Sequence, residues 1–127
     1  MMIVLRIALS LLGLLFVFMG AGFLFDPAGN GADFGLQATG PQGLSSIRGD
    51  LTAFFWVSGG SLLIGVWREN AMLLCVAAAL MGIVFAARAL SLALDGSYDA
   101  WFVPMAIEGL TVALALVAAR MIARKTA

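Results

Sequence analysis

Four long apolar runs dominate this chain, and each is about as long as a membrane-spanning helix. Because a helix rises about 1.5 Å per residue, about 20 apolar residues cross the roughly 30 Å hydrocarbon layer of a bilayer. Charged residues make up 11% of the chain, whereas soluble proteins use about a quarter. We therefore predict an all-α fold, a polytopic membrane four-helix bundle with up-down topology, as a single domain over residues 1–127. The predicted spans cover about residues 3–25, 46–67, 71–94 and 101–122.

The first run, residues 3–25, carries Arg6 near its start and then nineteen residues without charge. A signal peptide is the alternative interpretation, with Gly20, Ala21 and Gly22 as small residues near a cleavage site. The apolar region of a signal peptide is usually about 7 to 15 residues long, which is shorter than this stretch. The length therefore favours a membrane span.

Residues 26–45 differ from the runs on either side because they are rich in glycine, proline and polar residues. Asp26-Pro27 is expected to end the first helix, since proline cannot donate to the helical hydrogen-bond ladder and restricts the residue before it. A loop of about this length is often a lid or a mobile segment. We expect either a lid, with Phe34 and Leu36 dipping into the interface, or a solvated tether.

Two charged residues interrupt the last two apolar runs. Arg88 lies seven residues before Asp95, and Glu108 lies seven residues after Trp101. The segment from Asp95 to Asp99 favours a tight connection, so the two helices should be antiparallel neighbours. Both charges then lie about 10 Å from the same membrane surface. Because an unpaired charge in a membrane is costly, we expect an Arg88–Glu108 pair that faces the interior of the bundle.

Further polar residues are expected at this level, since the second span begins on the same side of the membrane. The predicted polar cluster, with Thr52 as a neighbour, consists of Arg48, Asp50, Arg88, Ser91, Glu108 and Thr111. Two arginines and two carboxylates allow local neutrality, which a low-dielectric site requires. Two interpretations stay open. The cluster either sets helix register alone, or it lines a cavity where guanidinium groups hold the polar end of an amphiphile.

Basic residues predict how the spans are oriented. Four alternating spans place both termini on one side, together with Arg6, Arg68, Arg120, Arg124 and Lys125. The opposite side carries several aspartates and only Arg48 as a basic residue. The positive-inside rule therefore predicts that both termini are cytoplasmic and that the polar cluster lies in the outer half of the membrane.

Several classes of chemistry lack the residues that they need. The chain has no His, and its one cysteine, Cys75, lies within the third run, so we predict neither an intrachain disulfide nor a metal site. A formal net charge of zero gives no indication of nucleic-acid binding. No nucleophile-base pair, phosphate loop or dinucleotide motif is present. We therefore expect no cofactor and no catalytic residue.

A family resemblance rests on short motifs spread over nearly the whole chain. They are Ser46-Ile47-Arg48-Gly49-Asp50, Gly59-Gly60, Arg88 followed by Asp95-Gly96, and Glu108 in the last span. This pattern resembles a bacterial membrane family catalogued as a domain of unknown function. It is also similar to the wider group of small four-helix proteins that includes the DoxX-like family and the ergosterol-pathway scaffold protein.

The resemblance implies a four-helix bundle of the bacterial inner (plasma) membrane, with Arg48, Arg88 and Glu108 as its polar signature. Asp50 departs from the pattern, because such proteins often have a second glycine or an aromatic residue there. The resemblance implies no particular reaction.

Three function hypotheses follow. The first is a non-catalytic accessory or scaffold subunit, motivated by the small size of the chain and by small-residue faces suited to helix contacts. The second is a binding protein or carrier for an amphiphilic lipid, quinone or isoprenoid, with its head at Arg88 and Arg48. The third is a membrane enzyme that uses Glu108 as a general acid or base. The expected partners are the lipid bilayer, a membrane protein or amphiphilic ligand, and, in a homo-oligomer, further copies of the chain.

Overall fold

Residues 1–126, which the computed structural model describes, form helices joined by short connections and contain no strand. Four stretches are long and apolar enough to cross a membrane. The prediction of an all-α chain with four apolar spans is confirmed, and these helices indicate a multi-pass membrane protein. The elements are α1 (Met2–Phe25), α2 (Pro27–Asp33), α3 (Gly40–Ser46), the π-helical turn η1 (Ile47–Leu51), α4 (Thr52–Trp67), α5 (Ala71–Asp95) and α6 (Phe102–Thr126).

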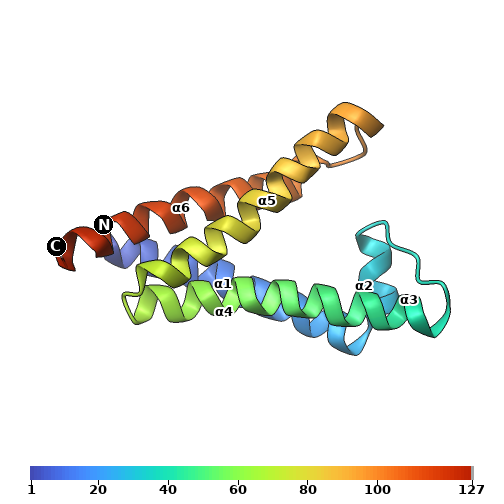
Figure 1. Ribbon diagram of the computed structural model, residues 1–127, viewed down its shortest axis with the longest axis horizontal. Helices are drawn as coiled ribbons and strands as arrows, with labels where there is room; N and C mark the ends of the chain where they lie inside the picture. Colours follow the sequence, from blue (N-terminus) through green and yellow to red (C-terminus); the bar gives the residue numbers. More distant parts are fainter. Residues whose placement is uncertain (127) are drawn as a thin grey trace.

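The four long helices run alternately in opposite directions and form two pairs, α1 with α4 and α5 with α6 (Figure 1). Both termini and the α4–α5 turn lie at one end of the molecule, which we call the closed end. At this end α4 packs against α5, and the two pairs lie together. The pairs diverge toward the other end, the open end, where α2, α3 and the α5–α6 turn lie.

The segment 26–45, predicted as a loop, contains two short helices. Asp26 ends α1, and its side-chain Oδ1 then accepts a hydrogen bond of 3.0 Å from the backbone N–H of Gly29. Pro27 occupies the first turn of α2, where a missing N–H costs nothing. Pro41 has the same place in α3. Asp26 therefore ends α1 and begins α2. The short helix α3 continues through η1 into α4 without a break.

Side-chain size differs between the two ends of the bundle. Small residues are buried near the closed end, with Ala77 on α5 and Ala115 and Ala118 on α6 all fully inaccessible. Nearer the open end the buried side chains of the α1–α4 pair are aromatic, and the rings of Phe23 and Phe55 stack with centroids 5.7 Å apart. Small side chains allow helix axes to approach closely, which agrees with the contact of the two pairs at the closed end, although larger side chains such as Leu62 and Leu74 are fully buried there as well.

Hydrogen bonds and a close glycine contact join α1 to α4 along most of their length. A Cβ atom added to Gly59 would lie 2.6 Å from the carbonyl oxygen of Gly13, so the two backbones nearly touch. The side-chain donors of α4 and η1 that bond to α1 are Arg48 to Leu24 O, Thr52 to Gly20 O, Trp56 to Val17 O and Trp67 to Ser10 Oγ. These bonds follow one antiparallel register and make the α1–α4 pair a rigid unit.

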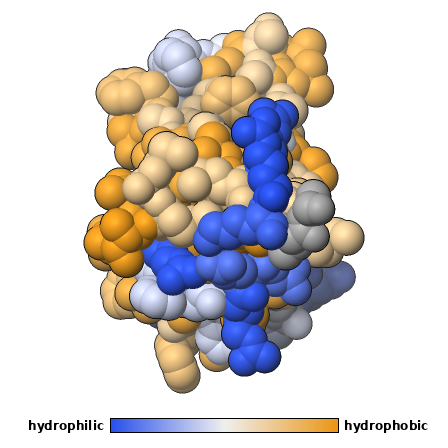
Figure 2. Space-filling model, turned by 90° about the vertical axis from the view of Figure 1, so that its left-hand side faces the viewer, coloured by the Kyte–Doolittle hydropathy of each residue, from blue (hydrophilic) through white to orange (hydrophobic). Residues whose placement is uncertain are grey.

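Charged residues gather at the closed end, where Figure 2 shows hydrophilic side chains between apolar flanks. Glu69, in the α4–α5 turn, accepts from Arg6 on α1 and from Lys125 on α6, with Nζ of Lys125 3.3 Å from Oε1. The guanidinium carbon of Arg6 also lies 5.6 Å from the centre of the Trp67 ring. One acidic residue thus joins three helices at this end.

Candidate functional site

Arg88 and Glu108 are in contact between the last two helices. Arg88 Nε lies 2.7 Å from Glu108 Oε1, and the two residues come from α5 and α6 on either side of the tight turn. The Arg88 side chain is 28% exposed, whereas that of Glu108 is 9% exposed. A charge-assisted hydrogen bond of this length is among the stronger polar contacts in proteins. The structure therefore brings together the two charges that interrupt the last two apolar runs.

Tyr98 is a further neighbour of Arg88 and was not predicted from the sequence. Arg88 Nη1 lies 3.4 Å from the Tyr98 hydroxyl, which comes from the turn between α5 and α6. This separation is long for a hydrogen bond, so the Tyr98 hydroxyl is a weak partner of the guanidinium group. The available signal in the sequence was a tyrosine in the short connection that follows the apolar run of Arg88.

The second carboxylate oxygen of Glu108 has no hydrogen-bond partner among residues 1–126, although it is buried. Buried polar atoms in proteins are nearly always hydrogen-bonded, and an exception requires an explanation such as a bound water, ion or ligand. Oε1 accepts from Arg88, whereas Oε2 lies beneath the accessible surface. Glu108 therefore holds Arg88 in place through Oε1, and its Oε2 is not open to the cavity beside it.

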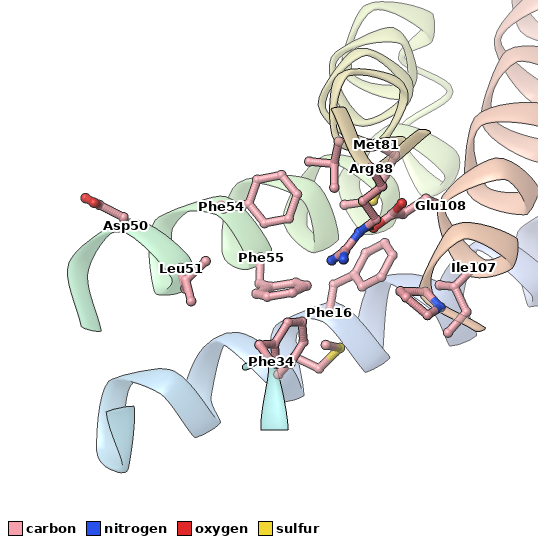
Figure 3. Close-up of a pocket in the computed structure, with 13 residues that line it drawn as sticks. Phe16, Phe34, Asp50, Leu51, Phe54, Phe55, Met81, Arg88, Ile107 and Glu108 are labelled. Atoms are coloured by element: carbon pink, nitrogen blue, oxygen red, sulfur yellow. Dashed lines mark hydrogen bonds and ion pairs between the residues drawn. The ribbon is translucent and has the colours of Figure 1, made fainter. Parts of the chain in front are cut away.

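That space is a cavity of about 390 Å³ between the two helix pairs. Arg88 and Glu108 form its polar part, and Figure 3 shows the guanidinium group directed into the space framed by the Phe16, Phe54 and Phe55 rings. The apolar wall comes from all four long helices, from the end of η1 and from the residue that follows α2; it consists of Phe16, Met19, Phe34, Leu51, Phe54, Phe55, Met81, Val84, Pro104 and Ile107.

A second cavity, of about 750 Å³, adjoins the first at the open end. Both cavities share Met19, Phe34, Arg88, Pro104 and Ile107 in their walls, so they lie side by side. The outer rim of the second cavity is formed by the end of α2 on one side and the α5–α6 turn on the other. Arg88 therefore lies where an apolar inner chamber meets a more polar mouth.

Arg48 and Asp50 lie away from the Arg88–Glu108 pair, so the predicted cluster of four charges is divided. Arg48 is exposed and donates from Nε to the carbonyl oxygen of Leu24 over 2.9 Å. Asp50 is exposed at the edge of the inner cavity and points away from it (Figure 3). Counting residues along a helix estimates the depth of a side chain in the membrane. It does not give the distance between side chains on the two diverging helix pairs.

The hydroxyl residues of the predicted cluster have local partners. Ser91 is exposed and donates to Asp95 on its own helix over 2.7 Å. Thr111 is fully buried and donates to the carbonyl oxygen of Ile107 over 2.7 Å. Thr52 joins α4 to α1 through Gly20. None of the three lines either cavity, so their geometry fits helix packing.

A comparison with protein families matches residues 4–119 to the model described as Domain of unknown function (DUF4345). The chain belongs to this family. Every residue that lines the two cavities lies within the matched DUF4345 region. No curated protein and no solved structure matches the chain. The wider similarity to the DoxX-like family and the ergosterol-pathway scaffold protein therefore stays a prediction.

Sequence reasoning missed most of the aromatic wall, although it expected Phe34 to dip into the interface. Phe34 packs edge-on against Phe23 at a centroid distance of 5.3 Å, and it lines both cavities. Phe16 and Phe23 are seven residues apart on α1 and contact the same ring, Phe55. This seven-residue spacing was the available signal, because it places two rings on one helix face.

The chemistry available in the cavity is recognition of a polar head group. Within residues 1–126, no group of three or more His, Cys, Asp or Glu side chains could hold a metal ion. What the site offers is a guanidinium with unused donors and an apolar wall beside it. This combination can orient a molecule that has one polar end and one apolar end.

Proposed function

We propose that this member of the DUF4345 family binds one amphiphilic molecule in the cavity between its two helix pairs. The observation that carries the proposal is the Arg88 guanidinium group, which has unused donors and is directed into an otherwise apolar cavity (Figure 3). The head of the ligand contacts Arg88 and Glu108, and its apolar part lies along the aromatic wall. A lipid, an isoprenoid or a quinone has this division of polarity.

The size of the cavity supports the proposal. Ligand pockets usually have volumes of about 300 to 1,000 Å³, are mostly apolar and contain a few polar groups that fix orientation. The inner cavity has about 390 Å³, and Arg88, Glu108 and the rim residue Asp50 are its charged lining residues. Its position between diverging helices gives an apolar chain a path from the bilayer.

We also propose that the protein lies in the bacterial inner membrane with both termini in the cytoplasm. The basic residues Arg68, Arg124 and Lys125 are exposed at the closed end, which agrees with a cytoplasmic surface. The open end and its cavity then lie in the outer half of the bilayer. The site would exchange its ligand with the outer leaflet.

Native mass spectrometry of the protein, extracted in a mild detergent, tests the ligand proposal. We expect a small mass in addition to the bare chain in the wild type, and we expect this mass to be lost in Val84→Phe, because Val84 lines the cavity. Ile83→Phe is the matched control. Ile83 precedes Val84 on α5, is 67% exposed and lines neither cavity, so this variant should retain the mass.

Arg88→Leu should also lose the bound mass, since it removes the donors that face the head group. A wild type that carries no extra mass, or a Val84→Phe variant that keeps it, contradicts the proposal. If a second protein instead accompanies the chain at fixed stoichiometry, the accessory or scaffold role is the better explanation. Turnover of a bound lipid that stops in Glu108→Gln would favour the enzyme hypothesis.

A further inference from the structure

Charged side chains are distributed unevenly over the two cavities, and this distribution bears on the head group that they can hold. Arg88 lies in the wall of both, and it is the one cationic residue that lines either cavity within the described part of the chain. Asp33, at the end of α2, and Asp99, in the α5–α6 turn, line only the second cavity, which we call the outer cavity. A molecule that enters from the open end therefore meets two carboxylates first and the guanidinium group deeper (Figure 1).

Arg88 is suited to a phosphate group at the boundary between the cavities. A guanidinium group has about five N–H donors, of which the described residues use one at Nε and, over a longer distance, one at Nη1. Its terminal nitrogen atoms are directed into the space between the two helix pairs (Figure 3). A planar guanidinium group can hold a phosphate through two parallel hydrogen bonds.

The other charges in the cavity walls favour a head group that also carries a positive charge. Glu108 already neutralises Arg88 at 2.7 Å. Asp33 and Asp99 are exposed and have no ion-pair partner among residues 1–126. A purely anionic head group would contact Arg88 but would be repelled by Glu108 and by both aspartates, whereas a cationic group in the outer cavity would be attracted by the same aspartates.

We infer that the two cavities together bind a zwitterionic phospholipid whose head group ends in a primary ammonium. The phosphate contacts the Arg88 guanidinium, the ammonium lies in the outer cavity with Asp33 and Asp99, and an acyl chain lies along the aromatic wall of the inner cavity. A primary ammonium has three N–H donors for the carboxylates, whereas a quaternary ammonium has none. This inference rests on the proposed function and narrows its ligand to one class of lipid.

Competition among lipids with identical acyl chains tests the inference. The protein is placed in phosphatidylcholine nanodiscs that contain phosphatidylethanolamine, phosphatidylglycerol or diacylglycerol at the same mole fraction, and the bound lipid is measured by native mass spectrometry. We expect phosphatidylethanolamine to bind at least about fivefold more tightly than each of the others, phosphatidylcholine included, because two exposed ion pairs together give roughly this factor.

Asparagine substitutions in the outer cavity give a readout that a merely structural role for the aspartates would not produce. Asp33→Asn/Asp99→Asn keeps the shape of both side chains, and it should lower the preference for phosphatidylethanolamine over phosphatidylglycerol by about fivefold. Asp99→Asn alone should lower this preference by about twofold. Loss of structure alone would instead weaken the binding of all lipids alike.

Asp95→Asn is the matched control for Asp99→Asn. Asp95 is the last residue of α5, four residues before Asp99, and it is exposed and lines neither cavity. The variant removes one carboxylate from the same end of the molecule, so it should keep the wild-type preference for phosphatidylethanolamine.

Two results would overturn the inference and leave the proposed function standing. In the first, another lipid binds the wild type as tightly as phosphatidylethanolamine and Val84→Phe abolishes this binding, so the cavity binds lipids without selecting an ammonium. In the second, the preference survives in Asp33→Asn/Asp99→Asn or is lost equally in Asp95→Asn, so its origin lies outside the outer cavity. If the double variant does not fold, the comparison of Asp99→Asn with Asp95→Asn decides.

A third result separates failure of the inference from failure of the proposed function. If no added lipid binds the wild type more tightly than Val84→Phe, the inference is wrong. A small mass that accompanies the wild type from its native membrane and is lost in Val84→Phe would then show a ligand of another class. Absence of that mass as well would remove the proposed function together with the inference.

Discussion

The α1–α4 pair and the α5–α6 pair are built from helices of similar apolar character but are held together differently. Backbone contact at Gly13 and Gly59 and side-chain bonds from Arg48, Thr52 and Trp56 to carbonyl oxygens join α1 to α4. Between α5 and α6, the structure shows one side-chain ion pair within residues 1–126, Arg88 with Glu108. Among the described residues, each pair contains one buried side-chain atom without a hydrogen-bond partner, Nε of Arg6 and Oε2 of Glu108, so the pairs differ chiefly in that the second directs a charged group, the Arg88 guanidinium, into the cavity.

This difference bears on the proposed function. A side-chain donor bonded to a carbonyl of the neighbouring helix adds packing strength. The Arg88 guanidinium faces the cavity and has donors that the described residues do not use. In the proposed function, the α1–α4 pair therefore contributes apolar wall, and Arg88 on α5 supplies the polar recognition.

Removal of Glu108 should have the largest effect, because it breaks the single ion pair between α5 and α6. We expect Glu108→Leu to lower the free energy of unfolding by about 2 to 3 kcal/mol. Breaking a fully buried ion pair usually costs about 3 to 5 kcal/mol, and the smaller value is expected here because Arg88 is partly exposed. Unfolding in mixed micelles with increasing sodium dodecyl sulfate, followed by tryptophan fluorescence, measures this change.

The double variant Arg88→Leu/Glu108→Leu separates charge from packing. It should recover part of the loss, with a coupling energy of about 1 to 3 kcal/mol between the two sites. Ser91→Ala is the control, since Ser91 is exposed and bonds only within α5; its effect should stay within about 0.5 kcal/mol. Strictly additive effects of the two leucine substitutions would show that the ion pair does not stabilise the α5–α6 pair.

Gly59→Ala should have the next largest effect and acts on the other helix pair. The added Cβ would meet the carbonyl oxygen of Gly13, which is backbone and cannot rotate away. We expect a loss of about 1 to 2 kcal/mol in the same unfolding assay, in the lower part of the usual range of about 1 to 3 kcal/mol for overpacking, because alanine favours the helix more than glycine does.

Gly60→Ala is the matched control for this variant. It has the same chemistry one residue further along α4, but a Cβ on Gly60 meets nothing within 4 Å. Because alanine favours a helix over glycine by about 1 kcal/mol, Gly60→Ala should be neutral or slightly more stable. Equal effects of the two variants would argue against close backbone contact between α1 and α4.

Two threonines provide the smallest and most specific comparison. Both are buried, but Thr52 donates across to Gly20 on α1 over 3.2 Å, whereas Thr111 donates to Ile107 within α6. Thr52→Val should cost about 0.6 kcal/mol, the average for hydrogen bonds between membrane helices. Thr111→Val should cost less, since it removes no contact between helices. The reverse order, measured by the same micelle titration, would contradict the assignment of Thr52 as a link between α1 and α4.

Predictions from the sequence were most useful where the physics is local. The four spans depend on helix length and apolar composition, which are read directly along the chain. The placement of Arg88 and Glu108 depends only on helical rise and a tight turn, and the two side chains are in contact in the structure. The two short helices in residues 26–45 were not predicted, although Pro27 and Pro41 are typical of first helical turns.

Arg48 shows the limit of the same reasoning. Counting residues gives the depth of a side chain, but not its distance from residues on other helices at that depth. Arg48 bonds to the end of α1 on the side of its own pair, and the divergence of the two pairs leaves it away from Arg88. The cavity lining was equally beyond sequence reasoning, because no single helix carries it.

The sequence by itself determined that this chain forms four apolar helices, where they turn, and which two charges interrupt them. Only the tertiary structure decided that the helices join as two pairs, that the pairs diverge, and that Glu108 keeps one oxygen without a partner. The physical reason is that helix formation depends on neighbours within a few residues, since each backbone hydrogen bond spans one turn. A cavity is the space that four helices fail to fill, so it depends on the packing of all of them at once.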